Sequence, residues 1–426
     1  MVSRPAGIFL RRASVGMILW LAVGLLHSNP RASSERAPER LVAVGDVHGD
    51  VDDLCLILRR TGLVDDRNRW IGGNATLVQT GDLVDRGPKG REAMELLIGI
   101  EKEAAKAGGQ VVPLFGNHEV MNILGDLRYV TPQGYASFAD NESEKRRKAA
   151  YQDYAAWCAR HAKMLATLKQ TTLLATEEDW MAKHPVGFLE YVEAFSPNGT
   201  YGKWLRQHST VVKIGGTIFL HGGIHPNLVS LPLEQINSQV QQEIEEFDKT
   251  RQYLVSRKMI LPFFTIQEIA VAAQAELAER ASETPSDAED HASLVRLLGF
   301  DNWLCMRDDG PLWFRGYDQW NEEEASLQIG KILAAYDAEH IVVGHTVQKA
   351  AHIRSRFEGR VFLIDTGMLS EYWKGGRASA LDIRAGGKFT AVYLDGQEVL
   401  LEEKPSASVK KENGTSFWIT LASKGL

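Results

Sequence analysis

A short apolar run that stops abruptly at a glycine-containing turn recurs six times along this chain and most constrains its fold. Runs of this length, rich in β-branched residues and bounded by glycine, are typical of buried β-strands. Segments with helical character, at 52–60 and 91–106, separate several of them. Alternating strands and helices predict an α/β fold whose polar residues emerge at one end of the strands. The expected strands are Leu41–Val44, Thr76–Thr80, Val111–Phe115, Thr217–Leu220, Ile341–Val343 and Val361–Ile364.

Two stretches depart from this alternation. Residues 125–205 show helical periodicity within 144–168, and residues 232–300 show it within 234–247 and 266–281. Both are predicted to be helical insertions that frame or cover the end of the strands where the polar turns lie.

The C-terminal part, 379–402, alternates like strands, and Asp395-Gly396 is a favourable hairpin turn. We expect it to form a second, partly antiparallel sheet that packs on the first. The main domain is then assigned to 40–124 and 206–426, interrupted by the two insertions.

The N-terminal segment, 1–34, has a different composition. It contains four arginines and no acidic residue, and 13–26 form one apolar stretch. A basic flank followed by a short apolar run is typical of a secretory signal, and 14 residues are few for a bilayer span. We therefore expect a protein of the secretory lumen, the exterior or the periplasm. An uncleaved membrane anchor and a mitochondrial import sequence remain open, and any membrane association would use this segment alone.

Composition excludes some classes of function. The 426 residues are 44% hydrophobic and 24% charged, with a formal net charge of −7. The one basic run, 145–148, lies beside Glu142 and Glu144, so a nucleic-acid partner is not expected. Cys55, Cys158 and Cys305 are an odd, sparse set, which argues against a disulfide framework but leaves one bridge open.

The turns after the expected strands carry residue types that bind divalent metals. Each alone has an ordinary explanation: an Asp-x-His is usually a turn, and an Asn-His can be a helix cap. Six such turns in one chain favour two metals held at strand ends, where they can neutralise a phosphate and activate a water. Glycine in these turns permits close approach. The candidate ligands are Asp46, His48, Asp82, Asn117, His221 and His345.

The same residues fall in blocks that resemble a known family. The chain is similar to the metallophosphoesterases of the calcineurin-like superfamily, of the phosphoprotein phosphatase type, and especially to the Shewanella-like protein phosphatases. The resemblance covers 41–367 apart from the insertions. It implies a two-sheet β-sandwich core flanked by helices. The blocks are Gly45-Asp-Val-His-Gly49, Gly81-Asp-Leu-Val-Asp-Arg-Gly87, Gly116-Asn-His-Glu119, His221-Gly222-Gly223 and Gly344-His345-Thr346.

The resemblance also implies roles. Asp46, His48 and Asp82 would bind one metal, Asp82 would bridge, and Asn117, His221 and His345 would complete the second. His118 would be the general acid, held by Asp85, while Arg86, Asn117 and Arg315 would contact the substrate phosphate. Arg315 could instead simply stack on Trp313. The attack would be in line, by a metal-bridging hydroxide, and the mixed ligands suit Mn, Fe or Zn.

Departures from the eukaryotic serine/threonine phosphatases leave the substrate open. Phe115 stands where those enzymes typically carry arginine, and 364–368 replace their Ser-Ala-Pro-Asn-Tyr motif. The expected substrate is a phosphoprotein or phosphopeptide, modified on tyrosine or on serine and threonine. A dinucleoside polyphosphate hydrolase is the alternative enzyme, although Asp85 and Glu119 favour a protein phosphatase. A non-catalytic scaffold of the same fold is a further alternative.

Overall fold

The computed structural model describes residues 38–168, 176–280 and 288–402. The chain divides into two units, Met1–Arg36 and Ala37–Leu426, and the fold below is that of the second. The expected leader, 1–34, lies outside the described residues. No helix within the described ranges combines the length and apolar character needed to cross a membrane. The three cysteines all fall inside these ranges and are free thiols.

The first sheet has six strands in the order β11-β10-β9-β1-β2-β3. Its strands β1, β2 and β3 are parallel, and β9 joins them antiparallel to β1, with Leu41 opposite Ile383. The bounds are β1 (Arg40–Val44), β2 (Thr76–Gln79), β3 (Gln110–Pro113), β9 (Ser379–Arg384), β10 (Lys388–Tyr393) and β11 (Gln397–Glu402).

The second sheet has five strands in the order β4-β5-β6-β8-β7. Its three central strands, β5, β6 and β8, are parallel, and the two edge strands are antiparallel to them. The bounds are β4 (Val211–Ile214), β5 (Thr217–Leu220), β6 (His340–Val343), β7 (Arg354–Arg356) and β8 (Val361–Leu363).

The expected place of the C-terminal strands was wrong. They do form three antiparallel strands with a turn at Asp395-Gly396, but they extend the first sheet through β9 rather than building the second. Alternation marks strands with a buried face, yet it does not choose their partner. The pairing of β9 with β1 is a long-range choice between Arg40–Val44 and Ser379–Arg384.

An apolar core fills the space between the two sheets. Its residues come from the inward faces of both, as expected for a sandwich. A second, larger core lies on the outer faces of the sheets, where helices cover them. The inter-sheet core includes Leu41, Ala43, Val78, Phe219, Val342, Phe362, Ile364, Leu381 and Phe389.

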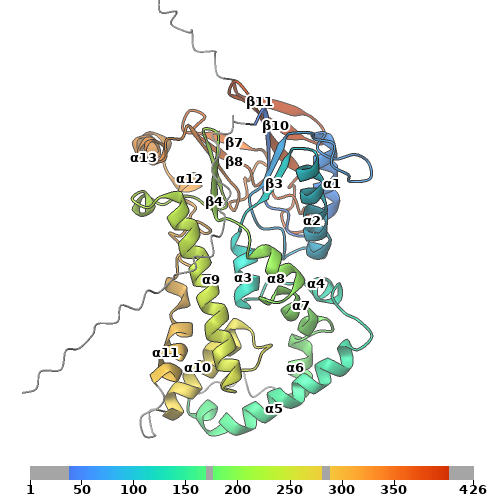
Figure 1. Cartoon of the computed structure of the whole chain (residues 1–426), viewed down its shortest axis with the longest axis vertical. Helices are drawn as coiled ribbons and strands as arrows, with labels where there is room; N and C mark the ends of the chain where they lie inside the picture. The colour runs from blue at the N-terminus through green and yellow to red at the C-terminus, as the bar shows by residue number, and fades with distance from the viewer. Residues whose placement is uncertain (1–37, 169–175, 281–287, 403–426) are drawn as a thin grey trace, which may run out of the picture. The chain divides into compact units, whose positions relative to one another are not determined.

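Helices cover the sheets and extend beyond them, as Figure 1 shows, where α5, α6, α10 and α11 lie at the end away from β10 and β11. Residues 125–205 contain α4 to α8, and 232–300 contain α9 to α11. The helices are α1 (Val51–Arg60), α2 (Gly90–Lys106), α3 (Asn117–Leu124), α4 (Pro132–Ala136), α5 (Ser143–Thr167), α6 (Glu177–Lys183), α7 (Phe188–Phe195), α8 (Thr200–Leu205), α9 (Leu233–Ser256), α10 (Ile266–Arg280), α11 (Ala288–Leu298), α12 (Gly316–Gln319) and α13 (Glu322–Ala335).

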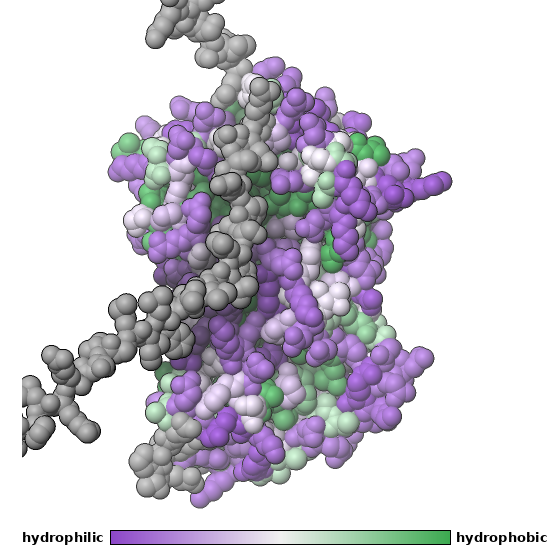
Figure 2. Space-filling view, in the orientation of Figure 1, coloured by the Kyte–Doolittle hydropathy of each residue, from purple (hydrophilic) through white to green (hydrophobic). Residues whose placement is uncertain are grey.

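Hydrophilic side chains predominate over the described part of the face shown in Figure 2, and hydrophobic ones form small separate groups. The basic run on α5 belongs to this kind of surface, because Lys145 and Arg147 pair with Glu142 and Glu144. Scattered apolar residues of this kind are normal on a protein surface.

Candidate functional site

The carboxyl ends of the parallel strands of both sheets converge on one buried cluster of polar side chains. Asp46 and His48 follow β1, Asp82 follows β2, Asn117 opens α3 after β3, and His221 and His345 follow β5 and β6. All are buried, with at most 6% of their surface exposed. A cavity of about 300 Å³ opens beside them. The structure therefore brings together all six candidate ligands, which are separated by up to 299 positions in sequence.

The turns that carry these residues are held in unusual backbone conformations. Five non-glycine residues of the site have positive φ, between 49° and 70°: His48, Asp82, Asp85, Arg86 and His345. Each such residue costs about 1–3 kcal/mol, and strain of this kind collects at functional sites. At Gly81, φ is +93° and an added Cβ would lie 2.3 Å from the Gly116 nitrogen, so only glycine fits where the turns after β2 and β3 meet.

Three histidines present an unprotonated nitrogen to the cluster. His48 Nδ1 lies 3.1 Å from the Val84 carbonyl, and His221 Nδ1 lies 2.8 Å from the Thr80 carbonyl. His345 Nε2 lies 3.1 Å from the Trp313 carbonyl. Because a carbonyl can only accept, each of these nitrogens carries the proton, and the opposite nitrogen keeps its lone pair. Backbone carbonyls orient metal-binding imidazoles in the same way.

Asp82 lies at the centre of the cluster and faces two groups of these nitrogens. Its Oδ2 is 3.7 Å from His48 Nε2, and its Oδ1 is 3.4 Å from His221 Nε2. His345 Nδ1 is 3.1 Å from His221 Nε2. Two sets of potential ligand atoms result, His48–Asp82–His118 and Asp82–His221–His345, and they share Asp82. The arrangement is that of a carboxylate between two cation positions.

The other two candidate ligands lie beside these sets. The Asn117 Oδ1 is 2.9 Å from His221 Nε2, on the Asp82–His221–His345 side. Asp46 uses Oδ1 to accept the His345 backbone N–H at 3.0 Å. Gly344 makes room for Asp46, because a Cβ there would lie 2.3 Å from the same oxygen.

Burial and charge shift the pKa values of the cluster in the metal-free protein. Burial lowers the pKa of His48 to about 3, and burial also lowers the pKa of His345 well below its ordinary value. Burial, Asp365 and Asp82 raise the pKa of Asp46. Burial opposes ionisation of Asp82 too, but the neighbouring His221 and His118 hold its pKa well below the ordinary range. Neutral imidazoles beside buried acids are a donor set that fits divalent cations.

His118 is part of a hydrogen-bonded chain that leads into the helical insertion. Its Nδ1 lies 2.6 Å from Asp85 Oδ2, and the Asn122 amide donates to Asp85 Oδ1 at 3.0 Å. The Tyr191 hydroxyl of α7 then donates to Asn122 Oδ1 at 2.6 Å. Burial lowers the pKa of His118, but Asp82 and Asp85 outweigh burial and leave that pKa above its ordinary value. This side chain is therefore suited to hold a proton.

Two arginines border the cavity. Arg86 lies between the rings of Tyr129 and Tyr372, at 4.8 and 3.9 Å from their centroids, and its Nη2 is 3.3 Å from His118 Nε2. Arg315 donates from Nη1 to the His345 carbonyl at 3.0 Å. Both side chains line the same cavity as the cluster, so each predicted arginine lies where an anion would enter.

The sequence analysis assigned three residues of this region no position or role in the centre. Glu119 accepts the backbone N–H groups of Asp82, Leu83 and Gly116 at 2.7, 2.8 and 2.9 Å, and so fixes the turn that carries Asp82. The position of Glu119 in the Gly116-Asn-His-Glu119 block was the sequence signal that could have indicated this role. Asn122 lies one turn after His118, and Asp365 follows β8 like the ligands after β5 and β6. A single Asn or Asp in sequence does not reveal such a position.

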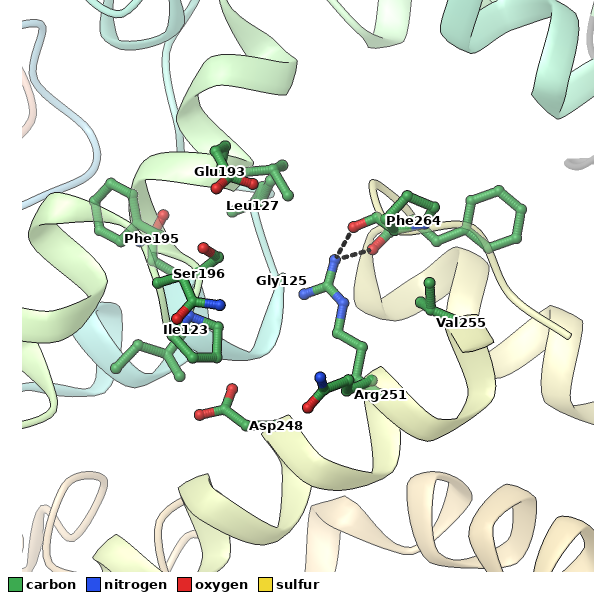
Figure 3. A pocket seen from close by; sticks show the side chains of 16 residues that line it. Ile123, Gly125, Leu127, Glu193, Phe195, Ser196, Asp248, Arg251, Val255 and Phe264 are labelled. Atoms are coloured by element: carbon green, nitrogen blue, oxygen red, sulfur yellow. Dashed lines mark hydrogen bonds between the residues drawn. The ribbon is translucent and has the colours of Figure 1, made fainter. Parts of the chain in front are cut away.

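A second cavity, of about 290 Å³, lies next to Asn122. Figure 3 shows Arg251 reaching from α9 towards Phe264, where its Nη2 donates to the carbonyls of Pro262 and Phe264 at 2.9 and 3.1 Å. Burial lowers the pKa of Arg251 to about 10. None of the candidate metal ligands lines this cavity. Among its lining residues, Asn122 is the one that belongs to the hydrogen-bonded series His118–Asp85–Asn122–Tyr191.

Comparisons with known proteins show which proteins the chain is similar to. Shewanella-like protein phosphatase 1 of Plasmodium berghei is 28% identical to the chain over 77% of its length and 67% of the relative. An uncharacterised protein of Schizosaccharomyces pombe is 30% identical over 79% of the chain and 75% of the relative. The solved cold-active protein-tyrosine phosphatase of a psychrophilic Shewanella species shares the fold, with a TM-score of 0.54, 24% identity and 85% and 81% of the two chains covered. The family model of the calcineurin-like phosphoesterases matches residues 39–349. The chain is a phosphatase hydrolase and belongs to the calcineurin-like phosphoesterase family, which confirms the resemblance and the two-sheet fold that the resemblance implied.

Proposed function

We propose that this protein hydrolyses phosphate monoesters on phosphoproteins with the help of two metal ions. The observation that carries the proposal is the position of Asp82, whose two oxygens face two separate sets of imidazole nitrogens. The relatives named Shewanella-like protein phosphatases support a phosphoprotein as substrate.

The proposed ligands divide into two groups around Asp82. Asp46 and His48 would join Asp82 for one metal, and Asn117, His221 and His345 would join it for the other. Bound there, two divalent ions would neutralise the phosphate and make a water nucleophilic near neutral pH. Mixed nitrogen and oxygen donors suit Mn, Fe or Zn.

The chain's own side chains would bind the phosphate and supply the proton. Arg86 and Arg315 border the cavity, and guanidinium groups match phosphate oxygens in geometry and charge. His118 would protonate the leaving oxygen from Nε2, because Asp85 holds the proton on Nδ1 at 2.6 Å. The ring of Tyr129, whose centroid is 5.1 Å from that of His118, lines the cavity beside this acid.

The entrance favours an aromatic phosphate among the possible substrates. Tyr129, Trp313, Tyr372 and Trp373 all line the cavity with the ligands. Aromatic rings around a phosphate-binding arginine would pack on the ring of a phosphotyrosine, whereas phosphoserine offers no such surface. We therefore include phosphotyrosine as the preferred residue in this proposal.

The proposal is tested by comparing substrates for the purified protein with Mn2+. Phosphotyrosine peptides, matched phosphoserine and phosphothreonine peptides, and diadenosine tetraphosphate would be assayed under the same conditions. We expect kcat/KM to be highest for phosphotyrosine peptides. Faster cleavage of the dinucleotide would contradict the protein phosphatase, and no turnover of any substrate by metal-loaded protein would favour the scaffold.

A further inference from the structure

We infer that Asp365 is a further carboxylate of the metal centre, serving the cation held beside Asp46; this rests on the proposed function. Asp365 follows β8, the third parallel strand of the second sheet. It thus occupies the same kind of position as His221 after β5 and His345 after β6. Its side chain lines the cavity that Asp82, His118 and His345 also line.

One side-chain oxygen of Asp365 is buried without a hydrogen-bond partner in the described part of the chain. Only 1% of the residue is exposed, and its Oδ1 accepts the Gly367 N–H at 2.9 Å. Its Oδ2 is buried and has no hydrogen-bond partner among the described residues. A buried carboxylate oxygen without a partner is costly, and native structures keep such atoms where a ligand or ion completes them.

The neighbours of Asp365 increase this cost. The charge of Asp82 raises the pKa of Asp365, and the charge of Asp365 raises the pKa of Asp46, whereas the Asp46 side chain lowers the pKa of Asp365. Within the described part of the chain, neither Asp46 nor Asp365 forms an ion pair with lysine or arginine. Like charges buried together are unfavourable unless a cation lies among them.

The position of the Asp365 backbone is also fixed. The Gln348 N–H donates to the Asp365 carbonyl at 2.8 Å. The turn that follows β8 lies close to the turn that follows β1, because a Cβ at Gly45 would lie 2.8 Å from the Ile364 carbonyl oxygen. The turns that carry Asp46 and Asp365 are thus packed closely together, and this packing opposes a separation of the strand ends that would relieve repulsion in the metal-free protein.

This assignment predicts opposite effects of one substitution on the two forms of the protein. In the metal-free form, Asp365→Asn removes repulsion and should raise the melting temperature. In the presence of Mn2+, it removes a negative charge and a donor from the centre and should weaken metal binding. Residues that support metal ligands typically contribute about 10–100-fold in metal affinity. A purely structural aspartate would instead lower the stability of both forms.

The experiment uses the full chain with Asp365→Asn and Asp365→Ser, and Glu371→Gln as the matched control. Glu371 is an exposed acid in the loop that follows Asp365, so its substitution makes the same charge change outside the centre. Melting temperature is measured in chelator and in Mn2+, and Mn2+ affinity and stoichiometry are measured by calorimetry and elemental analysis.

We expect Asp365→Asn, which keeps an acceptor for the Gly367 N–H, to melt higher than the parent in chelator. Both Asp365 variants should bind one of two Mn2+ ions about 10–100-fold more weakly. Glu371→Gln should match the parent in both tests. Parent affinity for both ions in the Asp365 variants, a fall in the stability of Asp365→Asn both with and without metal, or loss of folding of both variants in chelator would overturn the inference. A parent protein that binds no Mn2+, Fe or Zn would instead refute the proposed function.

Discussion

Replacing His118 by asparagine tests the role of the proposed general acid while leaving the proposed metal ligands unchanged. His118 is 2% exposed and bonded to Asp85, and its Nε2 lies 3.9 Å from Asp82 Oδ2. That distance also places His118 in one set of potential ligand atoms. Asparagine keeps a polar side chain of smaller size but cannot donate the proton as an acid of suitable pKa.

The expected loss depends on the leaving group. A positioned general acid contributes about 10²–10⁴-fold, which corresponds to about 3–5 kcal/mol of transition-state free energy. An alkoxide leaving from phosphoserine needs the proton most, and a phenoxide from phosphotyrosine needs it less. A nitrophenolate is already a good leaving group and needs it least. The loss in kcat should follow that order.

The assay measures kcat and kcat/KM for the three substrates, with metal content determined on the same samples. We expect His118→Asn to keep its metals and to lose turnover of phosphoserine peptide most. Asp85→Asn should show the same order, and the double variant should lose little more than His118→Asn, because the two residues act as one unit. Equal losses for all three substrates, or loss of a metal, would refute the assignment of His118 as the acid.

Three further predictions concern the centre and its surroundings. Asp82→Asn should lose both metals, measured by elemental analysis, and a variant that retains two per chain would remove the bridging role. Asn122→Ala leaves the Asp85 Oδ1 atom and the Tyr191 hydroxyl without their buried partner, so urea unfolding should show a loss of about 1–3 kcal/mol, and an unchanged midpoint would contradict this. Burial lowers the pKa of His161, but Glu276, 2.9 Å away, outweighs burial and raises that pKa above 6.5. The stabilisation by the His161–Glu276 pair is therefore fully present below about pH 6.5 and is lost as the pH rises through the raised pKa of His161. The unfolding free energy of the parent should fall over this pH range, and it should fall less in His161→Gln.

Much of the centre could be predicted from the sequence because its candidate ligands are local features of strand ends. A β-strand that stops at glycine places the next polar residue at the sheet edge, and parallel strands bring such edges together. The structure therefore unites Asp46, Asp82 and His345 as the pattern implied. The expected strands also appear, although β3 ends at Pro113 rather than Phe115.

What the sequence did not reveal depends on long-range packing. The series of hydrogen bonds that begins at His118 ends at the Tyr191 hydroxyl, which donates to Asn122. This contact depends on how α7, which carries Tyr191, lies against α3, which carries Asn122. Likewise, the sequence showed that 379–402 form strands but not which sheet they join, because β9 pairs with β1 across the whole domain. Asp365 belonged to the recognised pattern of turns, yet only its burial beside Asp46 distinguishes it from an ordinary turn residue.

The central claim is that two metal ions at Asp82 carry the hydrolysis of phosphoproteins. The most direct test is a titration of metal-free protein with Mn2+, in which phosphotyrosine peptide hydrolysis and bound metal are followed together. The account predicts that activity is absent without metal and reaches its plateau at two ions per chain. Full activity in chelator, or a plateau at one ion with Asp82→Asn as active as the parent, would contradict it.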